Sequence, residues 1–146
     1  MRAFLVTLLI MFAVPARMEH RGDPKPSLDE QILGEWIMIH YSRNGKPDRN
    51  RHGESWTFNR VHVHVRATDG ETDDQTYRLD TTKSPANVDF IIDSSGRAKV
   101  IAIAKIEDGQ LPVCYTPRVY GERPTVFASP PEGGIRLAVF TRRLAK

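Results

Sequence analysis

The chain has 146 residues, 21 basic and 18 acidic side chains, and a formal net charge of +3 at pH 7. So mild a charge does not favour nucleic acid or an anionic membrane as a partner, and the length suits one domain with a real core. The single cysteine, Cys114, excludes an internal disulfide, so burial must stabilise the fold. Because Cys114 lies in the apolar run LPVCYT, we expect a buried structural thiol rather than a reactive one.

The first 16 residues are predicted to be a secretory signal peptide. Arg2 precedes a near-continuous apolar run over residues 3–14. Val14 and Ala16 then suit the −3 and −1 positions of a cleavage site after Ala16. The run is shorter than the roughly 20 apolar residues of a membrane-spanning helix. We therefore expect export to the periplasm or the cell exterior, with no membrane span after the leader is removed. An uncleaved N-terminal anchor is the alternative.

Residues 17–27 are charged and contain Pro24 and Pro26, which predicts a flexible lead-in to a domain that spans residues 28–146. At the start of this domain, Ser27 followed by Glu30 matches a capping box. One short helical turn is therefore expected, ended by Gly34. The basic segment KPDRNRH (46–52) is interpreted as a solvated loop rather than a phosphate site.

Nearly all of the remaining sequence alternates between apolar and polar residues in short runs separated by turn residues. Asn44-Gly45 is a strong hairpin signal. Such spacing is typical of an all-β sandwich or barrel in which neighbouring strands pair antiparallel. About eight strands are predicted, at residues 35–42, 54–58, 61–67, 76–80, 87–93, 99–106, 111–116 and 135–143.

The segment TYRLDTTKSPANVDF (76–90) shapes the chain and offers no obvious catalyst. Tyr77 and Leu79 share one face of a strand, and Val88 and Phe90 share one face of the next. The polar connection between them is longer than a tight hairpin, and Pro85 stops either strand from running on. The segment indicates a fold and no reaction.

This segment is one of several short sequence motifs, the others being LGEW (33–36), NGKP (44–47), CYTP (114–117) and ERPTVFAS (122–129). In this order and spacing, over about residues 28–143, they resemble a planctomycete-expanded lipocalin-like domain family of uncharacterised function, usually found in exported proteins. The chain departs from the family at residues 102–104 (AIA), where Gly-x-Tyr is usual, and at Pro112, where a charged residue is usual. Since proline removes a ladder donor, Pro112 is expected at an edge or a bulge. The resemblance implies an antiparallel up-and-down β-barrel of about eight strands, of the calycin type, and no known reaction.

The resemblance also implies a role for Gly34-Glu35-Trp36, the G-x-W of the first strand of lipocalin-like barrels. There the tryptophan closes the barrel floor, often against a basic residue of the last strand. Arg142 or Arg143 is the expected partner, stacked over the indole. Trp36, Arg142 and Arg143 are thus the candidate ligand-binding residues, below a pocket. The alternative is a plug that merely closes a barrel filled by its own side chains.

His62 and His64 alternate with Val61, Val63 and Val65, so both imidazoles point to one side of a strand. With His40 they form a candidate zinc set, and a metal hydrolase is the corresponding function. We reject this metal site for two reasons. The sequence has no fourth ligand at a spacing typical of zinc sites. Burying the valines also gains free energy, whereas burying unpaired imidazoles costs it. The valines are therefore expected to point inward.

The carboxylates give no acid–base pair either, since nothing places Asp73-Asp74, Glu107-Asp108, or Asp89 with Asp93 in a shared cleft. We therefore predict no catalytic residue, no cofactor and no enzyme activity. The expected function is non-catalytic binding of a small apolar ligand or of an extracytoplasmic partner. An interaction or structural module with a filled barrel is the alternative.

Overall fold

The structure, a computed structural model, describes residues 25–143. The expected leader (1–16) and most of the lead-in lie outside the described residues. The one helix with α-geometry in this range is α1 (Leu28–Gln31), and the short helices η1 (Arg49–Arg51) and η2 (Arg118–Tyr120) have 3-10 geometry. The strands are β1 (Gly34–Arg43), β2 (Lys46–Pro47), β3 (Ser55–Phe58), β4 (His62–Arg66), β5 (Thr72–Asp80), β6 (Ala86–Ile92), β7 (Ala98–Ala104), β8 (Gln110–Pro117) and β9 (Arg136–Arg142).

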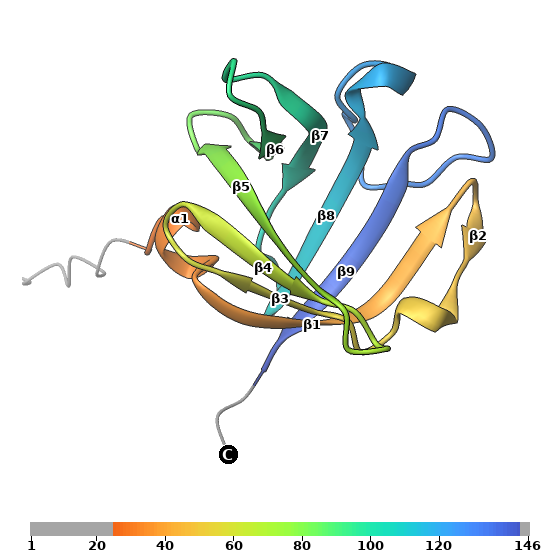
Figure 1. Cartoon of the computed structure of the whole chain (residues 1–146), viewed down its shortest axis with the longest axis horizontal. Helices are drawn as coiled ribbons and strands as arrows, with labels where there is room; N and C mark the ends of the chain where they lie inside the picture. Colours follow the sequence, from red (N-terminus) through yellow and green to blue (C-terminus); the bar gives the residue numbers. More distant parts are fainter. Residues whose placement is uncertain (1–24, 144–146) are drawn as a thin grey trace, which may run out of the picture.

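The strands form a closed antiparallel barrel. From β3 to β9 each strand pairs with the next one in sequence, β1 pairs with β3, and β9 returns to pair with β1 (Figure 1). The closing seam runs from Trp36↔Arg142 to Arg43↔Arg136. The two-residue strand β2 only extends the hairpin at Asn44-Gly45. The predicted eight-stranded lipocalin-like barrel is therefore confirmed, and the sandwich alternative is wrong.

Three local expectations need correction. The helix forms at Ser27, but the Ser27 side chain makes no capping hydrogen bond, so the capping box is absent. Strand β5 starts at Thr72 rather than at residue 76, because its polar first residues pair with β4 at the rim of the barrel, where they face water. Val61 lies before β4 and is 55% exposed, so it does not point inward.

The other two valines of VHVHV behave as expected. Val63 is fully buried and Val65 packs against the core, while His62 is exposed and His64 half-exposed. Pro112 lies one residue beyond the last β7–β8 pair, Ala104↔Val113, where β7 has ended. Its missing N–H therefore leaves no ladder partner unpaired, as an edge position requires.

An aromatic cluster fills the middle of the barrel. The indole of Trp56 lies at its centre, with ring centroids 4.9 Å from Phe140 and 5.6 Å from Phe90. Phe58 meets Tyr77 edge to face at 5.3 Å between centroids. Tilted and edge-on contacts of this kind stabilise a core beyond the area they bury. These aromatic side chains therefore occupy the middle of the barrel.

Candidate functional site

Trp36 and Arg142 close one end of the barrel, which we call the floor. The Trp36 side chain is buried, and its Nε1 donates to the carbonyl of Ile32 at 2.7 Å. The guanidinium carbon of Arg142 lies 4.5 Å from the centroid of the indole ring. Arg142 also donates to the carbonyls of Leu33, at 2.9 Å, and Gln31. The expected stacking partner of Trp36 is therefore Arg142, and the pair ties the α1–β1 connection to the last strand.

Arg143 does not take part in this contact. Its Nη1 pairs with Glu35 Oε1 at 2.8 Å on the outside of the barrel. A shallow groove of about 850 Å³ passes beside the floor, lined by Gln31, Ile106, Gln110 and Thr141 together with Trp36 and Arg142. Because Trp36 is 1% exposed, it offers this groove almost no surface. The contacts at the floor are those of a plug.

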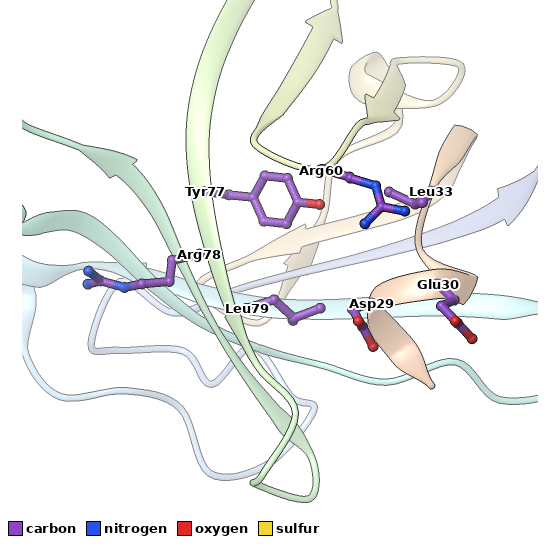
Figure 2. A pocket seen from close by; sticks show the side chains of 7 residues that line it. All are labelled: Asp29, Glu30, Leu33, Arg60, Tyr77, Arg78 and Leu79. Atoms are coloured by element: carbon purple, nitrogen blue, oxygen red, sulfur yellow. The ribbon is translucent and has the colours of Figure 1, made fainter. Parts of the chain in front are cut away.

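A second hollow lies between α1 and β5, as Figure 2 shows. It measures about 380 Å³ and is lined by two carboxylates, Asp29 and Glu30, and by the guanidinium group of Arg60, whereas the Arg78 guanidinium points away from it and pairs with Asp89. Tyr77 lines it and donates from its hydroxyl to the carbonyl of Asn59 at 2.5 Å. Burial, together with the nearby Asp29 charge, raises the pKa of Tyr77. The proton of the Tyr77 hydroxyl is therefore already committed to a backbone carbonyl.

The barrel interior is hollow at the end opposite the floor. This mouth cavity measures about 190 Å³ and lies between the end of β4, the start of β7 and the start of β9, with η1 over it. One part of its wall is apolar and the other polar. The apolar part is Trp56, Val65, Phe90, Ile91 and Val100, and the polar part is Arg51, Glu54, Gln75, Tyr115 and Arg136.

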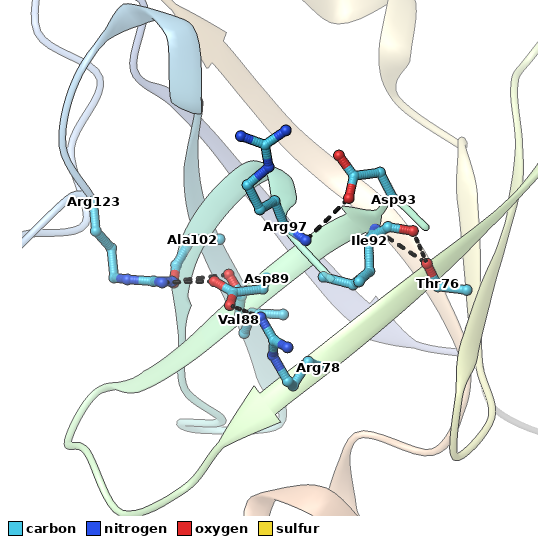
Figure 3. Close-up of polar contacts among 9 residues, drawn as sticks. All are labelled: Thr76, Arg78, Val88, Asp89, Ile92, Asp93, Arg97, Ala102 and Arg123. Atoms are coloured by element: carbon cyan, nitrogen blue, oxygen red, sulfur yellow. Dashed lines mark hydrogen bonds and ion pairs between the residues drawn. The ribbon is translucent and has the colours of Figure 1, made fainter. Parts of the chain in front are cut away.

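An irregular backbone conformation in β6 shapes the apolar wall. Ile91 has φ of +56°, a conformation that β-branched residues very rarely adopt. The consecutive residues Phe90 and Ile91 both line the cavity, whereas a regular strand would send their side chains to opposite faces. The Thr76 hydroxyl bridges the gap in the ladder, because it accepts from Ile92 N at 3.1 Å and donates to Ile92 O at 3.2 Å (Figure 3).

Glu54 organises the polar wall. It is 4% exposed and accepts two hydrogen bonds from Arg51, at 2.6 and 2.8 Å, and one from Trp56 Nε1 at 2.7 Å. Arg51 in turn donates to the Tyr115 hydroxyl at 3.2 Å and stacks over the Tyr41 ring at 4.4 Å. Burial raises the pKa of Tyr115 to about 12, which keeps this hydroxyl protonated at neutral pH. The network holds Arg51, Glu54 and Tyr115 in fixed positions.

Arg136 lies outside this network. None of the ion pairs within residues 25–143 includes it, and its Nε is buried without a hydrogen-bond partner among those residues. Its guanidinium carbon lies 5.8 Å from the centroid of the Tyr115 ring. Buried polar groups are hydrogen-bonded as a rule. An unpaired guanidinium nitrogen at a cavity can therefore donate a hydrogen bond to a ligand.

The three histidines of the rejected zinc set lie apart. His40 is on β1 opposite Val139 of β9, whereas His62 and His64 are on β4, and β3 separates the two strands. His64 Nδ1 instead lies 2.8 Å from Asp74 Oδ1 on β5. Over residues 25–143, the structure contains no group of three or more histidine, cysteine or carboxylate side chains arranged to hold a metal ion.

Cys114 is buried, as expected, and its thiol donates to the carbonyl of Ala128 at 3.3 Å. Burial raises the pKa of this thiol, which opposes formation of the reactive thiolate.

Within the described range, no helix has the length and apolar character needed to cross a bilayer.

Sequence reasoning missed most of the mouth cavity. Arg51 belongs to the segment 46–52 that was interpreted as a solvated loop, and the structure corrects this for Arg51 by turning it onto the barrel end. The sequence does carry one signal, since Arg51 and Glu54 are three residues apart, a spacing at which opposite charges can pair. Nothing in the sequence relates them to Arg136, because only the register of β8 with β9, Tyr115↔Arg136, brings that residue to the cavity.

A closed antiparallel barrel with a plugged floor and a small hollow at the other end is a lipocalin-like architecture, a class whose barrels bind ligands in the interior. Comparisons of the chain with models of known families, with curated proteins and with solved structures gave no match.

Proposed function

We propose that this chain is an exported, non-catalytic binding protein of the lipocalin-like class and that its mouth cavity takes up a small ligand. The observation that carries the proposal is the cavity itself, which has an apolar wall facing a few convergent polar groups. Binding sites for small molecules combine surfaces in this way. The backbone conformation at Ile91 adds support, since such costly conformations cluster at ligand sites.

The size of the cavity limits the ligand. A volume of about 190 Å³ is below the ~300–1,000 Å³ of sites for drug-sized molecules. It is slightly above the ~150 Å³ of a cavity known to accept benzene. The ligand that fits is therefore a single ring, or an aliphatic chain of similar bulk, with a small substituent. For Trp36 and Arg142 we propose the role of a plug, at the far end from this ligand.

The two tryptophans provide an internal test. Trp56 Nε1 lies at the cavity and Trp36 Nε1 at the floor, so the two indole N–H resonances of a ¹⁵N-labelled sample report the two ends separately. A panel of one-ring compounds that are neutral, cationic or anionic should contain members that shift the Trp56 resonance and leave that of Trp36 in place.

The matched control is Val100→Phe, which should fill the cavity and abolish every such shift without loss of the fold. If the whole panel leaves the Trp56 resonance unchanged at millimolar concentration, or if Val100→Phe binds as the wild type does, the mouth cavity is not a ligand site.

Export and membership of the planctomycete-expanded family are part of the same proposal. The apolar run of residues 3–14 supports the first, and the agreement between the implied and the observed barrel supports the second. Fusing residues 1–25 to a reporter should export the reporter, with cleavage after Ala16. Retention of the intact leader in the cytoplasm would contradict the proposed localisation.

A second candidate function, binding of a protein partner, is favoured by one observation. The connection between β8 and β9 exposes three large apolar side chains, Val119 at 85%, Tyr120 at 62% and Val126 at 64%. A photo-crosslinking residue in place of Tyr120 should then form a defined adduct in the exported protein in vivo. If the same residue at the exposed position 132 gives the identical adduct pattern, the apolar side chains have no specific partner.

A further inference from the structure

The mouth cavity carries an excess of positive charge. Its lining has two guanidinium groups, Arg51 and Arg136, and one carboxylate, Glu54. Glu54 is committed to Arg51 through two hydrogen bonds, a bidentate arrangement that neutralises this pair. The remaining charge is that of Arg136, whose Nε is buried, and an ion pair formed at a buried group is stronger than one in water.

Neighbouring groups do not neutralise Arg136. On the closing seam its register partner is Arg43, so two like charges face each other across β1 and β9. Both arginines also line a groove of about 480 Å³ outside the cavity, which contains Glu132. Of the ion pairs in the described part of the chain, none joins Glu132 to either arginine within 4.0 Å. Arg136 thus lines both the cavity and the groove, and its Nε has no hydrogen-bond partner among the described residues.

We infer that the ligand of the mouth cavity is a small organic acid, whose carboxylate binds Arg136 while its apolar body lies against Trp56 and Phe90. This inference rests on the proposed function and adds the chemical class of the ligand. A planar carboxylate matches the planar fork of a guanidinium. The Tyr115 ring centroid lies 5.8 Å from the Arg136 guanidinium carbon, and the Tyr115 hydroxyl is a further polar group of the cavity wall.

The apolar wall argues against an inorganic anion. Phosphate or sulfate satisfies a guanidinium but leaves the apolar surfaces of Val65, Ile91 and Val100 without contact. A one-ring acid fills both parts of the cavity at once, because its ring occupies about the volume of benzene and its carboxylate reaches the polar wall. A neutral one-ring compound fills only the apolar part.

The experiment compares benzoate with benzamide, which has nearly the same shape without the charge. Titration of the ¹⁵N-labelled protein, followed at the Trp56 indole resonance, should give a dissociation constant for benzoate at least about tenfold below that for benzamide. Arg136→Gln should weaken benzoate binding by about 10- to 100-fold, the range for a hydrogen bond to a charged group. The same variant should change benzamide binding little.

Arg66→Gln is the matched control. Arg66 ends β4 at the same rim, is exposed and does not line the cavity, so its loss removes the same charge from the same end of the molecule. Benzoate binding should be nearly unchanged in this variant. Equal weakening by Arg66→Gln and Arg136→Gln would show general attraction and overturn the inference.

The comparison of the two probes on the wild type needs no variant, so it stands even if Arg136→Gln fails to fold. Equal affinity for benzoate and benzamide would overturn the anionic ligand and leave the cavity as a binding site. If neither of these two probes shifts the Trp56 resonance, the organic acid is overturned too. Failure of the wider panel would then remove the proposed function itself.

Discussion

Arg123, in the β8–β9 connection, forms an ion pair with Asp89 of β6. Its Nη2 lies 2.6 Å from Asp89 Oδ1, and its Nη1 donates to the carbonyls of Val88 at 3.0 Å and Ala102 at 2.7 Å (Figure 3). Asp89 also accepts from Arg78 at 3.0 Å. Because Arg123 follows η2, these bonds fasten the long β8–β9 connection to β6 and β7. Arg123, the second residue of the segment ERPTVFAS (122–129), therefore has a structural role.

Arg123→Ala should destabilise the protein strongly. The change leaves Asp89 and two carbonyl oxygens without their shared donor, and the expected loss is about 2–4 kcal/mol in urea unfolding. Arg78→Ala is the matched control, since Arg78 pairs with the same carboxylate but is 58% exposed, and should cost less than about 1 kcal/mol. Similar losses for the two variants would mean that Arg123 is no more than a surface charge.

Trp36→Ala should cost about 3–5 kcal/mol of unfolding free energy, as truncation of a buried tryptophan usually does. The indole is 1% exposed and its Nε1 is hydrogen-bonded, so the variant leaves both a cavity and an unpaired carbonyl at Ile32. Chemical denaturation measures the change. Arg143→Ala, outside the floor, should be nearly neutral, and a Trp36→Ala loss below about 1 kcal/mol would show that Trp36 does not support the core.

Stability should fall in alkaline solution because of Tyr115. Burial raises its pKa to about 12 in the folded protein, against about 10 in an unfolded chain. The folded state thus holds its proton where the unfolded state has lost it. The contribution is fully present below about pH 10 and is lost as the pH rises towards 12, by an amount on the order of 2–3 kcal/mol.

The matched variant for this titration is Tyr115→Phe, which removes only the hydroxyl. Tyr77 and Cys114, whose pKa values are also raised, titrate in both proteins and cancel in the difference. Urea unfolding at about pH 9 and about pH 11 should therefore give a steeper loss for the wild type than for the variant. Parallel losses would contradict the assignment to Tyr115.

Replacement of both His62 and His64 by glutamine should leave the melting temperature unchanged, with or without added Zn²⁺. The imidazoles lie on the solvent side of β4, and the nearest polar partner of His64 is the exposed Asp74. A zinc-dependent rise in the wild-type melting temperature that disappears in the double variant would restore the metal site. Differential scanning calorimetry distinguishes the two outcomes.

The sequence predicted strands well and cavities badly, for physical reasons. Alternation reveals a strand when one face is buried, as in β6, where Val88 and Phe90 point inward. It fails for the first residues of β5, whose two faces both meet water at the rim. The contact of Trp36 with Arg142 was expected from the resemblance, since a G-x-W phrase and a basic last strand are both visible in the sequence.

The mouth cavity depends on features that leave no such trace. The positive φ at position 91 falls on an isoleucine, whereas glycine and asparagine are the residues that usually signal it in a sequence. Arg136 reaches the cavity through strand register, and Arg51 through a turn of η1 that folds back over the barrel end. Each of these is decided by closure of the whole barrel, which no local pattern encodes.

The seam between β1 and β9 determines when the molecule can become a barrel at all. Its two strands come from opposite ends of the domain, so the first strand has no partner on one side until the last has left the ribosome. Contacts between such distant segments form slowly, because the chain between them must be ordered first. Closure of the barrel therefore comes after synthesis of β9, and until then β1 keeps one edge open.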